Sequence, residues 1–179
     1  MKEIELYIDE KGEWIERISL VEEPAIEMDF MKFGKEKLFF ADAEKRIITG
    51  AVMIPEKRMW RNSNGGCYVY FSKDTVEKCA HRFLMEGKNK QFNLGHSTDT
   101  DKVSIVESWL KVSEADKSSA LGFTNVPVGT WFISCKVESP EIWGEIKSGE
   151  FNGFSIEGVF QYDDETEVIR EAEEFLGGF

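Results

Sequence analysis

One serine, Ser155, lies in a short aromatic stretch between two glycines, in the sequence GFSIEG at 153–158. A serine hydroxyl attacks a carbonyl carbon only when a neighbouring base removes its proton. The glycine spacing is not that of the Gly-x-Ser-x-Gly nucleophile elbow, and no strand–turn–helix pattern follows, so we exclude an α/β-hydrolase. In a strand, Ser155 would share its face with Glu157, and both could equally be polar residues turned to solvent.

The candidate bases are the two histidines of the chain, His81 and His96. His81 lies in a helical pattern beside apolar residues, where a surface or half-buried histidine is expected. Cys79 is too close to it in sequence for a convincing zinc pair, and no other Cys or His cluster supplies further ligands, so no metal site is expected. His96 follows Gly95 where a short apolar segment meets a polar turn, a junction from which a rigid scaffold can present a side chain. A capping or hydrogen-bonding role for His96 is the alternative.

Acidic side chains could pair with such a histidine. Glu107 lies in VSIVESWL at 103–110, where a regular strand would place it on one face with a valine, an isoleucine and a tryptophan. A carboxylate on an apolar face is costly unless it is paired, and a histidine would be a suitable partner. Alternatively, Glu107 lies on an edge strand and points to water. Asp163 and Asp164, which follow the segment of Ser155, are the other acidic candidates.

The elements that must position these residues are mostly short strands. Strand patterns fall at 4–9, 13–21, 46–55, 67–71, 91–96, 102–112, 129–137 and 151–162, and helical patterns fall at 72–87, 139–149 and near the C-terminus. The strands at 46–55 and 67–71 are expected to pair or to be neighbours in one sheet. Ser72 and Ser139 are expected N-caps. Many short strands with few helices favour a small barrel or curled sheet with helices packed outside.

Composition narrows the class of protein. The 179 residues suggest one domain with a core of its own. With 34 acidic and 22 basic residues, the formal net charge of -12 argues against a general nucleic-acid surface, which needs a basic stripe. Three cysteines without framework spacing are expected to be reduced thiols in a cytosolic setting. No charged-then-apolar leader and no apolar run near the ~20 residues of a membrane span are present, so we expect a soluble intracellular protein.

Six segments in order resemble a known family. They are RIITGAVMIP, YFSKDTV, NLGH, VSIVESWL, GTWFISCKV and WGEIKSGEFNGFSIEG. Together they resemble the XkdF-like serine proteases of tailed phages, which group with the prohead (capsid maturation) proteases. The segment ISLVEEPAIE is similar to the one that precedes the protease domain in such proteins, so the resemblance covers roughly residues 15–162.

The resemblance implies a fold distantly similar to herpesvirus assemblin. Such a fold is α+β and mainly β, with a small, mostly antiparallel β-barrel flanked by helices. On this basis, residues 1–40 are an N-terminal strand and linker extension. Residues 41–162 are the prohead-protease-like domain, and residues 163–179 are a C-terminal helix.

The resemblance also implies a function and a site. The protein would be a serine endopeptidase that cleaves phage scaffold and major capsid proteins, and also itself, inside the assembling prohead in the host cytoplasm. It would be a homo-oligomer with no cofactor, metal, nucleic-acid or membrane partner. Ser155 would be the nucleophile, His96 the general base, and an acidic residue the third member. Glu107 is the choice for this third residue, with Asp163 or Asp164 as the alternative.

Two further interpretations compete with this one. The first is a catalytically inactive structural or scaffold-associated protein of phage capsid assembly, which buried surroundings of Ser155 would favour. The second is a cysteine hydrolase that pairs Cys67 or Cys135 with His96. Cys135 alternates within the apolar strand WFISCKV, where a buried inert thiol is the default expectation.

Overall fold

The computed structural model describes residues 3–8, 11–12, 14–23, 45–62 and 66–162, together with the backbone of 169–170. The strands are β1 (Glu3–Leu6), β2 (Ile15–Val21), β3 (Ile47–Met53), β4 (Met59–Arg61), β5 (Cys67–Phe71), β6 (Phe92–Leu94), β7 (Thr98–Thr100), β8 (Val103–Leu110), β9 (Trp131–Val137), β10 (Gly153–Phe160) and β11 (Ile169–Arg170). The helices are α1 (Lys73–Met85), α2 (Lys117–Ala120) and α3 (Pro140–Ser148).

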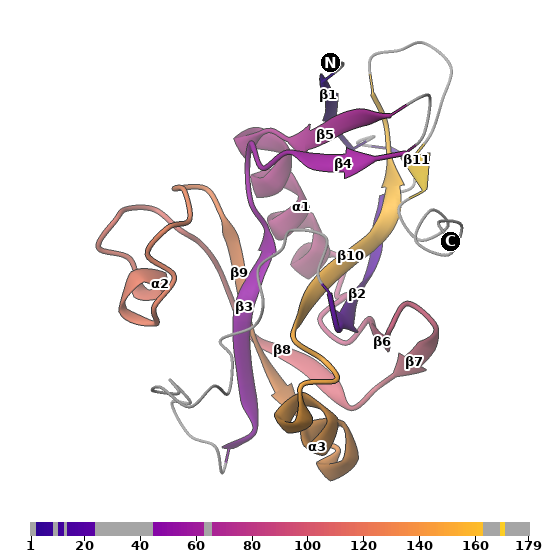
Figure 1. Cartoon of the computed structure of the whole chain (residues 1–179), viewed down its shortest axis with the longest axis vertical. Helices are drawn as coiled ribbons and strands as arrows, with labels where there is room; N and C mark the ends of the chain where they lie inside the picture. The colour runs from indigo at the N-terminus through magenta and orange to yellow at the C-terminus, as the bar shows by residue number, and fades with distance from the viewer. Residues whose placement is uncertain are drawn as a thin grey trace.

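The fold is mainly β with few helices, as predicted (Figure 1). Within the described ranges the strands form three open sheets, in the orders β1-β5-β4, β11-β10-β2-β6-β7 and β3-β9-β8. The sheets are mostly antiparallel, although β1–β5 and β2–β6 pair in parallel. One isolated bridge, between Tyr7 and Gln161, links the first two of these sheets. In the described ranges the strands do not close into a ring, so the expected barrel is not confirmed.

The two longer helices begin where the sequence predicted. The hydroxyl of Ser72 accepts a hydrogen bond from the Thr75 N–H at 3.3 Å at the start of α1. The hydroxyl of Ser139 accepts one from the Ile142 N–H at 3.1 Å at the start of α3. At the end of α3, Gly149 has a φ of 87°, a left-handed conformation that glycine adopts without a steric cost.

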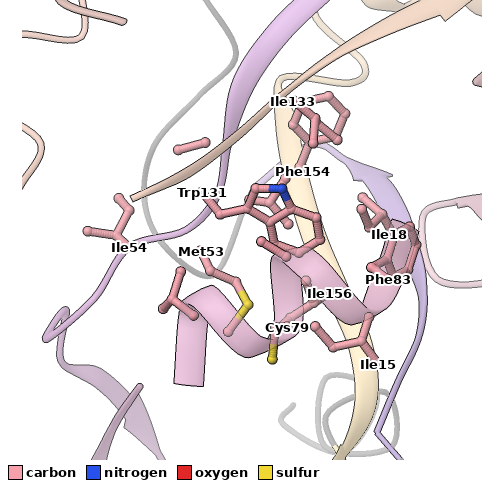
Figure 2. Packing of buried hydrophobic residues seen from close by; sticks show 14 of the residues in the cluster. Ile15, Ile18, Met53, Ile54, Cys79, Phe83, Trp131, Ile133, Phe154 and Ile156 are labelled. Carbon is pink, nitrogen blue, oxygen red and sulfur yellow. The ribbon is translucent and has the colours of Figure 1, made fainter. Parts of the chain in front are cut away.

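Helix α1 packs its apolar face against the β3-β9-β8 sheet and against the residue just before β2. The ring of Phe83 lies 5.8 Å from that of Trp131 on β9 and 6.3 Å from that of Trp14, just before β2. Burying one such ring stabilises the fold by roughly 1.5–3 kcal/mol. Figure 2 shows Phe154 and Ile156 of β10 within the same core. Because side chains alternate along a strand, Ser155 and Glu157 must point to the opposite face of their sheet.

The N-terminal strands belong to the sheets themselves. Strand β2 lies between β10 and β6, and β1 pairs with β5, so residues 3–6 and 15–21 are strands of these sheets. The neighbouring positions expected for β3 and β5 are wrong, because β3 pairs with β9 while β5 pairs with β1 and β4. Residues 169–170 form β11 on the edge of β10 instead of helix. The rest of the predicted helix at 163–179 lies outside the described residues.

Candidate active site

Three polar side chains lie side by side on one face of the β11-β10-β2-β6-β7 sheet. Antiparallel pairing places Ser155 of β10 opposite Ser19 of β2. Parallel pairing then places Ser19 opposite Asn93 of β6. Directly opposed residues have Cβ atoms only about 4.5–5.5 Å apart. The strand register therefore brings together residues that are far apart in the sequence.

His96 reaches the same site from the turn between β6 and β7. The turn is closed by a hydrogen bond of 3.1 Å from the Ser97 N–H to the Leu94 carbonyl. Its two central residues, Gly95 and His96, both have a φ of 56°. Positive φ is uncommon outside glycine, although histidine is enriched there several-fold. Tight turns between antiparallel strands commonly have positive φ at both central residues, so the hairpin itself accounts for this conformation of His96.

The carboxylate of Glu157 joins these residues. Its Oε1 accepts hydrogen bonds from Ser19 Oγ at 2.6 Å and from Asn93 Nδ2 at 2.5 Å. The same oxygen lies 2.7 Å from Nδ1 of His96. Ser19 Oγ also lies 3.0 Å from that Nδ1 and contacts Asn93 Oδ1. Ser19, Asn93 and Glu157 are 0%, 2% and 7% exposed, so the network is shielded from water.

The ionisation of Glu157 bears on which ring nitrogen of His96 carries a proton. Burial alone would raise the pKa of Glu157, but the hydrogen bonds from His96, Ser19 and Asn93 outweigh it and lower this pKa to about 2. An ionised carboxylate can only accept hydrogen bonds. In the neutral ring, the proton of His96 therefore lies on Nδ1, next to this carboxylate, and Nε2 is the acceptor. This is the tautomer that a general base in a serine triad requires.

The structure places Ser155 on the sheet face that His96 approaches. Ser155 lies opposite Ser19, whose hydroxyl is 3.0 Å from the imidazole of His96. Among the hydrogen bonds of the described residues, none joins the Ser155 hydroxyl to the ring directly. Ser155 is 6% exposed. The two residues are thus one strand apart in a closed site.

Glu107 does not lie beside His96. Its carboxylate, on β8, accepts a hydrogen bond of 3.0 Å from Ser134 of β9 and pairs with Lys117 of α2. The carboxylate that contacts His96 is Glu157, which corrects the predicted pairing.

Strand β8 belongs to a different sheet from β10, and it contains a bulge. Ile105 pairs with Cys135 and Glu107 pairs with the next residue, Ser134, so Val106 is an extra residue in the strand. One inserted residue reverses the alternation of side chains. Glu107 therefore leaves the apolar face that a regular strand would have given it. Asp163 and Asp164 lie outside the described residues.

The other candidate residues, His81 and the cysteines, do not belong to this cluster of polar side chains. His81 is exposed on α1, as expected. All three cysteines are buried free thiols, and burial raises the pKa of Cys79 to about 12 and that of Cys135 well above its ordinary value. Among the residues that the structure describes, no group of His, Cys, Asp or Glu side chains is arranged to hold a metal ion. In the same residues, no helix is both long and apolar enough to cross a membrane.

Sequence reasoning missed Ser19, Asn93 and the role of Glu157. A signal for Glu157 was present, because it lies two residues after Ser155 and so shares its strand face. Ser19 is a hydroxyl within the otherwise apolar ISLV, which was a weaker signal. Nothing local distinguishes Asn93 from an ordinary strand residue.

Comparison with known proteins relates the chain to phage proteins. A family model described as "Putative phage serine protease XkdF" matches residues 36–164. Phage-like element PBSX protein XkdF of Bacillus subtilis (strain 168) is 25% identical over 147 residues, which are 82% of this chain and 47% of that protein. Uncharacterized protein YqbD of the same organism is 25% identical over 116 residues, which are 65% of this chain and 32% of that protein. The chain thus spans about half or less of these curated relatives, and no solved structure matches it.

Proposed function

The chain belongs to the family described as "Putative phage serine protease XkdF", and from this premise we propose that it is a serine endopeptidase of phage prohead maturation. Its substrates are the phage scaffold and major capsid proteins, and also the chain itself. It acts as a homo-oligomer inside the assembling prohead in the host cytoplasm. The observation that carries the proposal is the 2.7 Å contact between His96 Nδ1 and Glu157 Oε1, on the sheet face that holds Ser155.

The proposed reaction follows from these roles. Ser155 Oγ attacks the peptide carbonyl carbon while His96 Nε2 takes the hydroxyl proton. The tetrahedral intermediate collapses, the C–N bond breaks, and His96 passes that proton to the leaving amine. Water then attacks the acyl-enzyme with His96 again as base, which releases the acid and restores Ser155.

Glu157 is a positioning residue in this mechanism. It stays ionised, holds the Nδ1–H tautomer, and stabilises the imidazolium that forms when Nε2 takes a proton. Ser155 must meet Nε2 during the reaction. Catalytic hydrogen bonds are often long or misaligned before substrate binds and tighten in the complex, so the resting geometry is compatible with this step.

A fluorophosphonate probe tests the nucleophile without a known cleavage site. Attack by Ser155 Oγ forms an O–P bond, fluoride leaves, and His96 takes the proton. Peptide mass spectrometry should locate the adduct on Ser155, and a co-expressed scaffold protein should be cleaved. Ser155→Ala should abolish both, while Ser148→Ala, an exposed serine on α3, should change neither. His96→Asn, which tolerates the same positive φ, should keep the fold and lose the reaction.

The second candidate is an inactive structural protein of capsid assembly. One observation favours it, which is the 6% exposure of Ser155. Scaffold cleavage that persists in Ser155→Ala, or a folded chain that neither reacts with the probe nor cleaves the scaffold, would overturn the protease proposal. An adduct on Ser19 in place of Ser155 would overturn the assignment of the nucleophile.

A further inference from the structure

The two oxygens of the Glu157 carboxylate face different partners. Oε1 accepts the hydrogen bonds from Ser19 and Asn93 and lies beside His96. Oε2 lies 3.6 Å from Nε of Arg17, which is opposite Glu157 in the strand register. The carboxylate therefore lies between His96 on one side and Arg17 on the other.

Arg17 competes for this carboxylate. Its Nη1 pairs with Asp99 of β7, but its Nε is a buried donor with no hydrogen-bond acceptor among the described residues. A buried donor without an acceptor costs free energy, so this group by itself favours a rotation of Glu157 toward Arg17. Something must oppose that rotation if Oε1 is to stay in contact with His96.

Ser19 and Asn93 supply the opposing contacts. Both side chains are almost fully buried, and both donate to Oε1, the oxygen that faces His96. Hydrogen bonds to a charged acceptor are among the stronger ones in proteins. Ser19 itself does not suit the role of nucleophile, because it is 0% exposed and lies on the Nδ1 side of the ring, where Glu157 already binds.

We propose that Ser19, together with Asn93, is a positioning residue that locks Glu157 against His96 and away from Arg17. The part of this inference that concerns catalysis rests on the proposed function. It also makes β2 part of the site, although residues 15–21 precede the segment of 36–164 that the family model matches. Glu157 is the charged group that contacts His96, Arg17 faces Glu157, and Asp99 pairs with Arg17.

The tautomer of His96 gives a readout that does not depend on activity. The chain has only two histidines, so ¹⁵N-histidine labelling yields two sets of ring signals, and His81→Gln assigns them. At a pH where the ring is neutral, we expect the wild-type chain to show His96 protonated on Nδ1. In Ser19→Ala we expect a mixture of both tautomers, because Glu157 has turned toward Arg17. Ser19→Thr, which keeps a hydroxyl, should restore the wild-type signals.

Ser134→Ala is the matched control. Ser134 is also a buried strand serine that donates to a glutamate, but its acceptor is Glu107. It should leave the His96 signals unchanged. A wild-type tautomer in Ser19→Ala, or an equal change in Ser134→Ala, would overturn the inference. If Ser19→Ala does not fold, Asn93→Ala removes the other donor and is judged by the same criteria.

The rate of Ser155 labelling by the probe separates the two proposals. Ser19→Ala should lower this rate on the order of tenfold to a hundredfold, the range expected for one hydrogen bond to a charged group. In the Glu157→Gln background it should lower the rate no further, because Ser19 acts through Glu157. If Ser19→Ala slows labelling as much in the Glu157→Gln background as in the wild type, Ser19 does not act through Glu157. Absence of labelling in the wild-type chain would refute the protease function, while the tautomer would still decide the role of Ser19.

Discussion

Glu157 of β10 and Glu107 of β8 each accept a hydrogen bond from a buried serine on the neighbouring strand, yet only Glu157 contacts a histidine. The partner of Glu107 is instead the ammonium group of Lys117. The two carboxylates thus have similar positions in their strands but different neighbours, a histidine for one and a lysine for the other. This pair offers a direct comparison of a carboxylate inside the site with one outside it.

Replacing each carboxylate by its amide should separate the two. Glu157→Gln removes the negative charge beside His96 and no longer enforces the Nδ1–H tautomer. We expect the labelling rate of Ser155 to fall on the order of 10³–10⁴-fold, as for other serine triads that lose this charge. Glu107→Gln should change the rate less than about threefold, since a largely exposed ion pair contributes little. Equal effects of the two variants would show that Glu157 has no special role.

The depressed pKa of Glu157 predicts a loss of stability in acid. This pKa falls from an ordinary 4.5 to about 2 in the folded chain. Its contribution, roughly 3 kcal/mol, is complete above the unfolded pKa and is lost as pH falls from near 4.5 through about 2. Urea unfolding between pH 6 and pH 2 should show a shallower pH dependence in Glu157→Gln than in the wild type. If the stabilities of the two proteins fall in parallel as the pH is lowered, the ionisation of Glu157 does not stabilise the fold.

A glycine is needed at position 158, where β10 lies against the start of β2. A Cβ atom at this position would lie 2.7 Å from both the Ile15 Cα and the Trp14 carbonyl oxygen, and backbone atoms cannot move aside cheaply. We expect Gly158→Ala to lower the free energy of unfolding by about 1–3 kcal/mol or more, and to slow the labelling of Ser155. Thermal and urea unfolding measure the first effect.

Gly144 of α3 is the control for that substitution. A Cβ there meets nothing within 4 Å. Gly144→Ala should therefore stabilise the chain by about 0.5–1 kcal/mol, because alanine favours a helix. If Gly158→Ala is as harmless as Gly144→Ala, the close approach of β10 and β2 is not as described.

Thiol reagents should not inhibit the reaction. Burial raises the pKa of Cys79 to about 12 and that of Cys135 far above its ordinary value, so their reactive thiolate forms are scarce at neutral pH. Cys67 is also buried. Treatment of the folded chain with iodoacetamide should leave Ser155 labelling and scaffold cleavage intact. Inactivation that tracks alkylation of Cys67 or Cys135 would instead support a cysteine hydrolase.

The amino-acid sequence determined the features that depend on neighbours along the chain. The starts of α1 and α3 follow from Ser72 and Ser139, whose hydroxyls cap backbone N–H groups three residues later. The family followed from short segments in order, and the family model confirms it. Ser155 and His96 could be named because few other residues had the right chemistry, although their roles stay predictions.

The tertiary structure alone decided which residues meet. Ser19 and Glu157 are 138 positions apart, and only the pairing of β2 with β10 places the hydroxyl on the carboxylate. Glu107 was the choice that a regular strand suggested, but β8 pairs within another sheet, and one bulge residue, Val106, changes the face on which Glu107 lies. A strand's register and bulges are set by its partners across the sheet, so local sequence cannot specify which carboxylate reaches His96.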